Sequence, residues 1–197
     1  SPGTYTVRLT VDEEVLEQPV EVRLDPTLEA SNRALRAQYR MASRLRDLTS
    51  VANDAMRGLD VVKAELAARK ASVEKLRRDM PEAVAGAGEE LQQGLVELLE
   101  VLTRPEGKTF WSPGPRLADQ LGSLFGAVNR AYAAPTAAHQ AFFDELETEC
   151  DETFGAINTF FGEALPALNA QLTEHGLPTL SVPDALEWAE PEREGWN

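Results

Sequence analysis

The chain opens with apolar and polar residues in alternation, and the alternation resumes after a short polar turn at Asp12 to Glu14. A period of two places one side of a β-strand in a core and the other side in water. We therefore expect a β-hairpin, with Pro19 at an edge or a bulge because proline cannot donate to a β-ladder. The alternating apolar residues are Tyr5, Val7, Leu9 and Val11 in the first strand and Val20, Val22 and Leu24 in the second.

Beyond Pro26 the apolar residues recur at spacings of three and four, which indicates helix. The pattern predicts one helix from about residue 31 to 79, roughly 70 Å long at 1.5 Å per residue. Ser31 or Asn32 can cap it, Pro81 marks its end, and a bend at Gly58 stays open. Only Arg69 interrupts its apolar series, which is Leu45, Leu48, Ala52, Ala55, Leu59, Val62, Leu66, Val73, Leu76 and Met80.

Three further helices are expected after this one. Pro105 and Gly107 end the second, Pro135 precedes the fourth, and Gly176 ends the fourth, which Pro166 should bend or divide. Their apolar stripes are Leu91, Leu95, Leu98, Leu99 and Leu102, then Leu117, Leu121, Leu124, Phe125 and Val128, and finally Phe142, Leu146, Cys150, Phe154, Ile157, Phe161, Leu165, Leu168 and Leu172.

These elements predict a mainly α fold, an antiparallel up-and-down helical bundle with a long first helix, preceded by the β-hairpin. We divide the chain into the hairpin at 1–26, the bundle at 27–177 and an extended acidic tail at 178–197. A two-stranded hairpin leaves its apolar face uncovered and is marginal in water. We therefore expect the hairpin to be the end of an Ig-like sandwich whose other strands lie upstream.

Charge and composition exclude some classes of function. The chain has 33 acidic and 19 basic residues, a formal net charge of −14, which repels the phosphate backbone of nucleic acids. No apolar run approaches the roughly 20 residues that a membrane-spanning helix needs. We therefore expect neither nucleic-acid binding nor a membrane span.

The residue types that usually carry chemistry are sparse. His139 and His175 show none of the common metal-ligand spacings, and Cys150 lies on an apolar stripe, where burial would raise its pKa and leave it inert. The acidic run "FFDELETECDE" could supply paired carboxylates for glycoside hydrolysis, but the same pattern is typical of the solvated face of a helix. We identify no catalytic, cofactor-binding or metal-binding residue.

Aromatic residues outside the helical stripes are the candidates for contact with a protein partner or a second copy of the chain. The alternative is that they pack on the bundle. These residues are Phe110, Trp111, Trp188 and Trp196.

Three segments together resemble the C-terminal region of secreted bacterial sortilin-like proteins, which carry Asp-box (BNR-repeat) β-propellers and are often labelled glycosyl hydrolases. The segments are "SPGTYTVRLTVDEEVLEQPVEVRLDP", "LRAQYRMASRLRDLTSVANDA" and "AAPTAAHQAFFDELETECDETFGAINTFFGEALPALNAQL". Each piece is common, but their order is unusual. No Asp-box repeat, Ser-x-Asp-x-Gly-x-x-Trp, occurs in the sequence.

The resemblance implies that the hairpin closes an Ig-like domain after the propeller, and that the bundle is a terminal accessory module outside the cell or in the cell envelope. Any sugar-cleaving site would then belong to the absent propeller. We expect a non-enzymatic role in docking, dimerisation or spacing. Two alternatives stay open: a hydrolase domain that uses carboxylates of the fourth helix, and an acidic adaptor in the cytoplasm.

Overall fold

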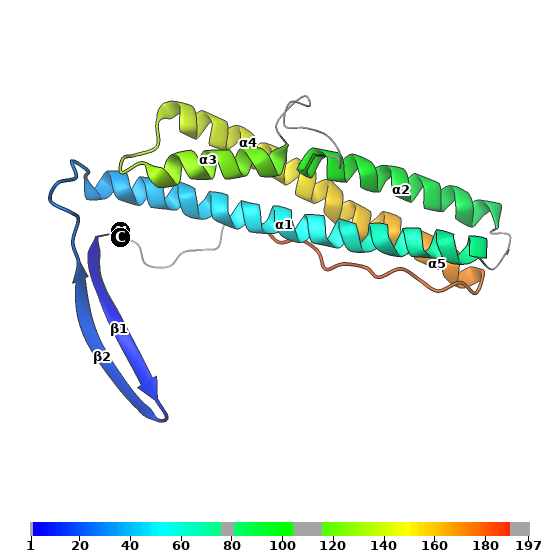
Figure 1. Cartoon of the computed structure of the whole chain (residues 1–197), viewed down its shortest axis with the longest axis horizontal. Coiled ribbons are helices and arrows are strands. Elements are labelled where there is room, and N and C mark those ends of the chain that lie inside the picture. The colour runs from blue at the N-terminus through cyan, green and yellow to red at the C-terminus, as the bar shows by residue number, and fades with distance from the viewer. Residues whose placement is uncertain (1, 76–80, 105–115, 190–197) are drawn as a thin grey trace.

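The computed structural model describes residues 2–75, 81–104 and 116–189. It is mainly helical, with a two-stranded hairpin at its N-terminal end (Figure 1). The predicted class, a helical bundle preceded by a β-hairpin, is therefore confirmed. The hairpin projects from one end of an elongated bundle (Figure 1).

The hairpin consists of β1 (Gly3–Val11) and β2 (Glu14–Val22), paired antiparallel with Val11 opposite Glu14. Asp12 occupies the turn with a φ of 53°, a left-handed conformation that aspartate tolerates better than most residues. The register pairs the apolar positions of one strand with mainly apolar positions of the other. It thus gives the hairpin two unlike faces.

Helix α1 (Asn32–Lys75) runs unbroken for 44 residues, about 66 Å at 1.5 Å per residue. The Ser31 hydroxyl caps its first turn by accepting from the backbone N–H of Ala34 at 3.1 Å. The predicted stripe is buried from Leu45 to Val62, whereas the side chains of its last members, Val73, Leu76 and Met80, fall outside the described part. Gly58 does not break the helix.

Helices α2 (Glu82–Leu102) and α3 (Leu117–Arg130) lie end to end along α1 and run antiparallel to it (Figure 1). Arg104 and Asp119 form an ion pair at 2.9 Å near the ends where the two helices meet. The Gln38 amide on α1 donates to the carbonyls of Val128 and Asn129 at 3.0 and 3.2 Å. The Val128 carbonyl also accepts from the Ala131 N–H, so the two Gln38 bonds tie the carbonyl end of α3 to α1.

A third rod completes the bundle and consists of α4 (Ala137–Thr159), a π-helical turn η1 (Phe160–Ala164) and α5 (Leu165–Glu174). The Thr136 hydroxyl caps α4 by accepting from the His139 N–H at 3.1 Å. In the π turn the Leu165 N–H donates to the Phe160 carbonyl, five residues back. Pro166 follows directly and has no N–H to donate, so the wider turn accommodates it within a continuous rod. Pro166 was expected to bend or divide this helix, whereas the structure has a π-helical turn directly before it and the helical elements follow one another without a gap.

Residues 177–189 form an extended strap that returns along the bundle beside α1 (Figure 1). Two asparagines hold it by pairing with both backbone groups of one strap residue. Asn169 bonds the N–H and carbonyl of Leu180 at 2.7 and 2.9 Å, and Asn158 does the same for Leu186 at 2.8 and 3.0 Å. The side chains of both leucines are buried, so the strap belongs to the core of the bundle.

Candidate functional site

The two faces of the hairpin differ in polarity. Residues directly opposite in an antiparallel pair point to the same side of the sheet, so the register assigns each residue to a face. One face, here called the apolar face, contains Tyr5, Val7, Leu9, Val11, Leu16, Val20 and Val22, with Gln18 opposite Val7 at its middle and Glu14 at its turn end. The other is mainly polar and contains Thr4, Thr6, Arg8, Thr10, Glu17, Pro19 and Glu21, with Val15.

The apolar face is open to solvent. Val7 is 56% exposed, Leu9 55% and Leu16 64%, although β-branched and leucine side chains in a sheet normally gain their stability from burial. Contiguous exposed apolar surface of this kind marks interaction sites. The apolar face is therefore the principal candidate site in the described structure.

The opposite face is suited to water. Arg8 and Glu17 lie opposite each other and form an ion pair at 2.5 Å, with both side chains largely exposed. Such a surface pair contributes only about 0–1 kcal/mol. The pair matters more for the orientation of the hairpin toward a partner. Burying a face with a charged pair at its middle is costly, so a partner is expected to contact the apolar face instead.

The two edges of the hairpin also differ. The two-residue turn closed by Val11 and Glu14 makes that pair hydrogen-bonded, so the pair of Thr6 and Pro19 is a non-hydrogen-bonded one. The backbone groups of such pairs point outward, and Pro19 therefore interrupts the donors on the outer edge of β2. On β1 the outward N–H groups of Thr6, Arg8 and Thr10 are all present. The edge of β1 is thus the better template for a further strand.

Of the aromatic residues predicted to contact a partner, the described part of the structure contains Trp188. Its ring packs edge-on against Phe154 with centroids 5.6 Å apart, and its indole N–H donates to an Asp151 carboxylate oxygen at 2.6 Å. Arg44 donates to the Trp188 carbonyl at 2.6 Å and to Glu147 at 2.8 Å. Trp188 therefore anchors the end of the strap to the bundle. Phe110, Trp111 and Trp196 lie outside the described residues.

Cys150 is fully buried on α4, as its place on the apolar stripe predicted. Burial, and to a lesser extent the nearby Glu149 carboxylate, raise the pKa of its thiol to about 12. A thiol that stays protonated is a poor nucleophile and a poor metal ligand. Across the described residues, no three side chains of the His, Cys, Asp and Glu types gather in a way that could hold a metal ion.

The carboxylates of the acidic run do not meet in a cavity that the structure describes. Most of these side chains are exposed along α4. A hollow of about 270 Å³ between α1 and α4 is lined by a single carboxylate, that of Glu147, which Arg44 engages. A glycosidase needs two carboxyl groups within roughly 5–10 Å of each other across its substrate. The described lining of this hollow contains one carboxyl group, that of Glu147.

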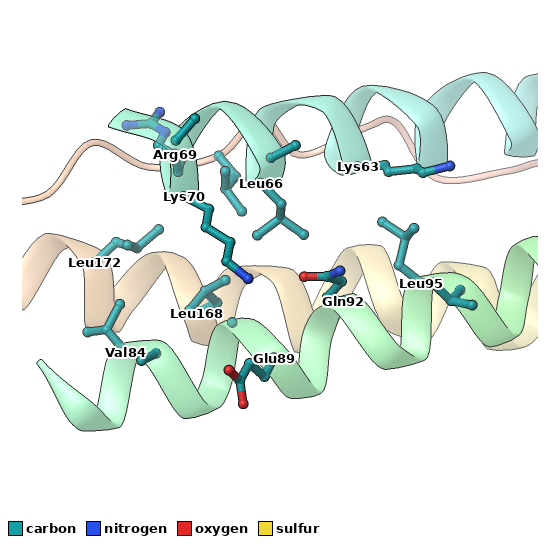
Figure 2. A pocket seen from close by; sticks show the side chains of 16 residues that line it. Lys63, Leu66, Arg69, Lys70, Val84, Glu89, Gln92, Leu95, Leu168 and Leu172 are labelled. Atoms are coloured by element: carbon teal, nitrogen blue, oxygen red, sulfur yellow. The ribbon is translucent and has the colours of Figure 1, made fainter. Parts of the chain in front are cut away.

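A larger cavity of about 450 Å³ lies between α1, α2, α5 and the strap (Figure 2). Leucines, valines and alanines form most of its lining, and charged side chains stand along α1 and α2 beside it. Sequence reasoning missed this cavity because its wall is assembled from four elements that are separate in the sequence. The only local signal is that Lys63 and Lys70 lie seven residues apart, on one side of α1.

Within the described ranges, no helix combines the length and the apolarity that crossing a bilayer requires. Comparisons of the chain with protein-family models, with curated proteins and with solved structures found no match.

Proposed function

We propose that this chain is a non-catalytic accessory module at the C-terminal end of a larger secreted β-propeller protein, joined to the rest of that protein through its hairpin. The observation that carries the proposal is the open apolar face of β1 and β2. Burial of such side chains contributes about 1.5–3 kcal/mol each. A partner that covers the face gains this free energy, and the bundle of this chain leaves it available.

The chemistry of the hairpin points to a β-structured partner. Two strands with one apolar and one polar face have the pattern of the outer layer of a β-sandwich, in which the apolar face packs on a second sheet about 10 Å away. The uninterrupted donors of β1 fit addition to the edge of an existing sheet. The hairpin thus suits the last two strands of an Ig-like domain.

The bundle would then serve as a rigid spacer or docking body. The continuous α1 helix and the third rod run most of the length of the molecule (Figure 1), so a partner held at the hairpin would be separated from the far end of α1 by tens of ångströms. Location outside the cell, and the propeller itself, rest on the resemblance of three sequence segments to sortilin-like proteins. Any glycosyl hydrolase activity would belong to that propeller.

Self-association is the second candidate, because the same apolar face could meet a second copy of itself. Light scattering coupled to gel filtration distinguishes the two. A strict monomer at high protein concentration would remove dimerisation and leave docking and spacing. A dimer that Leu9→Glu dissociates, and that the polar-face variant Thr10→Glu leaves intact, would favour self-association.

The intact mass of the protein isolated from its natural host tests the proposal. We expect a mass well above the 21.6 kDa of this chain, with peptides of this chain and of an upstream β-rich domain in the same molecule. A mass near 21.6 kDa would contradict the module assignment. The apolar face would then need a separate partner, as in the alternative of a cytoplasmic adaptor.

A further inference from the structure

The cavity between α1, α2, α5 and the strap has the size and lining of a small-molecule site. Its volume of about 450 Å³ falls within the range of roughly 300–1,000 Å³ that is typical of ligand pockets. Four separate elements converge on it, so it is a feature of the tertiary structure and not of one helix surface. Its lining residues on α1 lie between Lys63 and Ala71, toward the end of this helix that is away from the hairpin (Figure 1). The inference below is independent of the proposed function.

The interior of the cavity is apolar. Its wall is formed by side chains that face one another across the space between the helices (Figure 2). The aliphatic residues of this wall are Leu66, Val84, Leu95, Leu168, Leu172 and Leu180. Such a wall offers water no hydrogen-bond partner, so the interior favours an apolar occupant over water.

The charged residues beside the cavity are mostly cationic. Lys63, Arg69 and Lys70 line it from α1, whereas Glu89 supplies the one carboxylate among the lining residues that the structure describes. In a chain of net charge −14, this is a local reversal of sign. The potential at the opening therefore favours an anion over a cation.

Lys70 is the cation best placed to meet a ligand. Its side chain extends from α1 across the opening toward Gln92 and Glu89 on α2 (Figure 2). Arg69 already donates to the Thr179 carbonyl at 2.6 Å and thereby ties the strap to α1. Neither Lys63 nor Lys70 forms an ion pair with another residue of the described part.

We propose that this cavity binds a free fatty acid. The alkyl chain lies along the aliphatic wall, and the carboxylate accepts hydrogen bonds from the ammonium group of Lys70, with Lys63 adding to the favourable potential. An anionic head on an apolar tail matches both halves of the site. A neutral or cationic amphiphile matches only one half.

Calorimetric titration with dodecanoate, decanoate and octanoate tests the proposal on the whole chain. We expect dodecanoate to bind at one molecule per chain, and affinity to fall by about fourfold for each CH2 removed, since each methylene leaves an apolar wall. Dodecyltrimethylammonium, with the same tail and the opposite charge, should bind at least tenfold more weakly. Absence of dodecanoate binding, or equal binding of the cation, would overturn the proposal.

A matched pair of glycine variants on α2 locates the site. Gly88 lines the cavity and Gly86 does not, and a Cβ at either position meets nothing within 4 Å. Gly88→Leu should therefore fill the cavity and abolish binding, while Gly86→Leu leaves it unchanged. Leucine has a higher helix propensity than glycine, so both variants should fold, which circular dichroism checks.

The role of the cation and the source of the ligand need two further measurements. Lys70 lies at an exposed position. Lys70→Met should weaken dodecanoate binding about tenfold, and it should not weaken the binding of dodecyltrimethylammonium. Vesicles of dioleoylphosphatidylglycerol should not compete for the site. The proposal would be overturned if Gly88→Leu still bound both the vesicles and dodecanoate. The cations would then be assigned to contact with a lipid surface.

Discussion

At the scale of single residues, Gly58 shows that local helix propensity alone does not determine whether a long helix bends. The sequence left open a bend here, yet α1 continues through it. A Cβ built at Gly58 would lie 2.9 Å from the Phe161 ring and 3.3 Å from Pro183. Glycine is required because the third rod and the strap approach α1 closely. The helix tolerates the roughly 1 kcal/mol that glycine costs relative to alanine.

Gly58→Ala should lower the stability of the protein although alanine is the better helix former. We expect a net loss of up to about 2 kcal/mol, because overpacking costs about 1–3 kcal/mol and the gain in helix propensity is about 1 kcal/mol. Gly122→Ala on α3 is the matched control, since its Cβ meets nothing within 4 Å, and it should stabilise by about 0.4–1 kcal/mol. Urea unfolding measures both. Stabilisation by Gly58→Ala would contradict the close approach.

Cys150 predicts a specific dependence of stability on pH. Its folded pKa of about 12 lies above the ordinary value of 9.0, so the unfolded chain ionises first as pH rises. The stability associated with this thiol is fully present below pH 9 and is lost as pH rises toward 12, by about 1.4 kcal/mol per unit.

Urea unfolding of the natural protein and of Cys150→Val, under reducing conditions, isolates this effect from other groups that titrate in the same range. We expect the stability of the natural protein to fall relative to the variant between pH 9 and pH 11. Parallel pH profiles of the two proteins would show that the thiol ionises equally readily in both states, which its burial does not allow.

At the scale of elements, the strap is held by side chains that reach across the sequence. Glu65 on α1 accepts from the backbone N–H and the hydroxyl of Ser181, both at 2.7 Å. These two bonds, the backbone bond first, lower the pKa of Glu65 below its usual range. A lowered carboxylate pKa means that its contribution is present above about pH 4.5 and is lost as pH falls below that.

Glu65→Gln should loosen this part of the strap near neutral pH. We expect the amide of Ser181 to exchange with solvent about tenfold faster in the variant at pH 7, a change equal to about 1.4 kcal/mol. Glu152→Gln, an exposed carboxylate elsewhere on the bundle, is the control and should change nothing. Equal exchange in Glu65→Gln and the natural protein would show that the paired bonds do not hold the strap.

The elements differ in how well sequence predicts them, and the reason is the range of the forces that form them. The hairpin and the apolar stripe of α1 follow from the periodicity of apolar residues, which is a property of residues close together in the sequence. The strap depends on bonds between Asn158 and Leu186, 28 residues apart, and between Glu65 and Ser181, 116 residues apart. Such contacts leave no periodic trace. The strap was therefore expected as an extended tail, with no sign of its anchors.

At the scale of the whole molecule, an antiparallel helical bundle was predictable because short connections favour antiparallel neighbours. The cavity beside Lys70 was not predictable, because four elements that are separate in the sequence form its wall. The hairpin lies between these cases. The alternation from Tyr5 to Val11 predicts its apolar face, but only the structure shows that the bundle leaves that face exposed.

The proposed function requires the hairpin to dock on β-structure outside this chain. The most direct test is amide hydrogen exchange of β1, measured on the protein as its host produces it and on the isolated chain at a concentration where it is monomeric. The outward amides of Thr6, Arg8 and Thr10 should exchange rapidly in the isolated chain and be protected at least a hundredfold in the host protein. Equally rapid exchange in both would show that the edge of β1 has no partner and would contradict the claim.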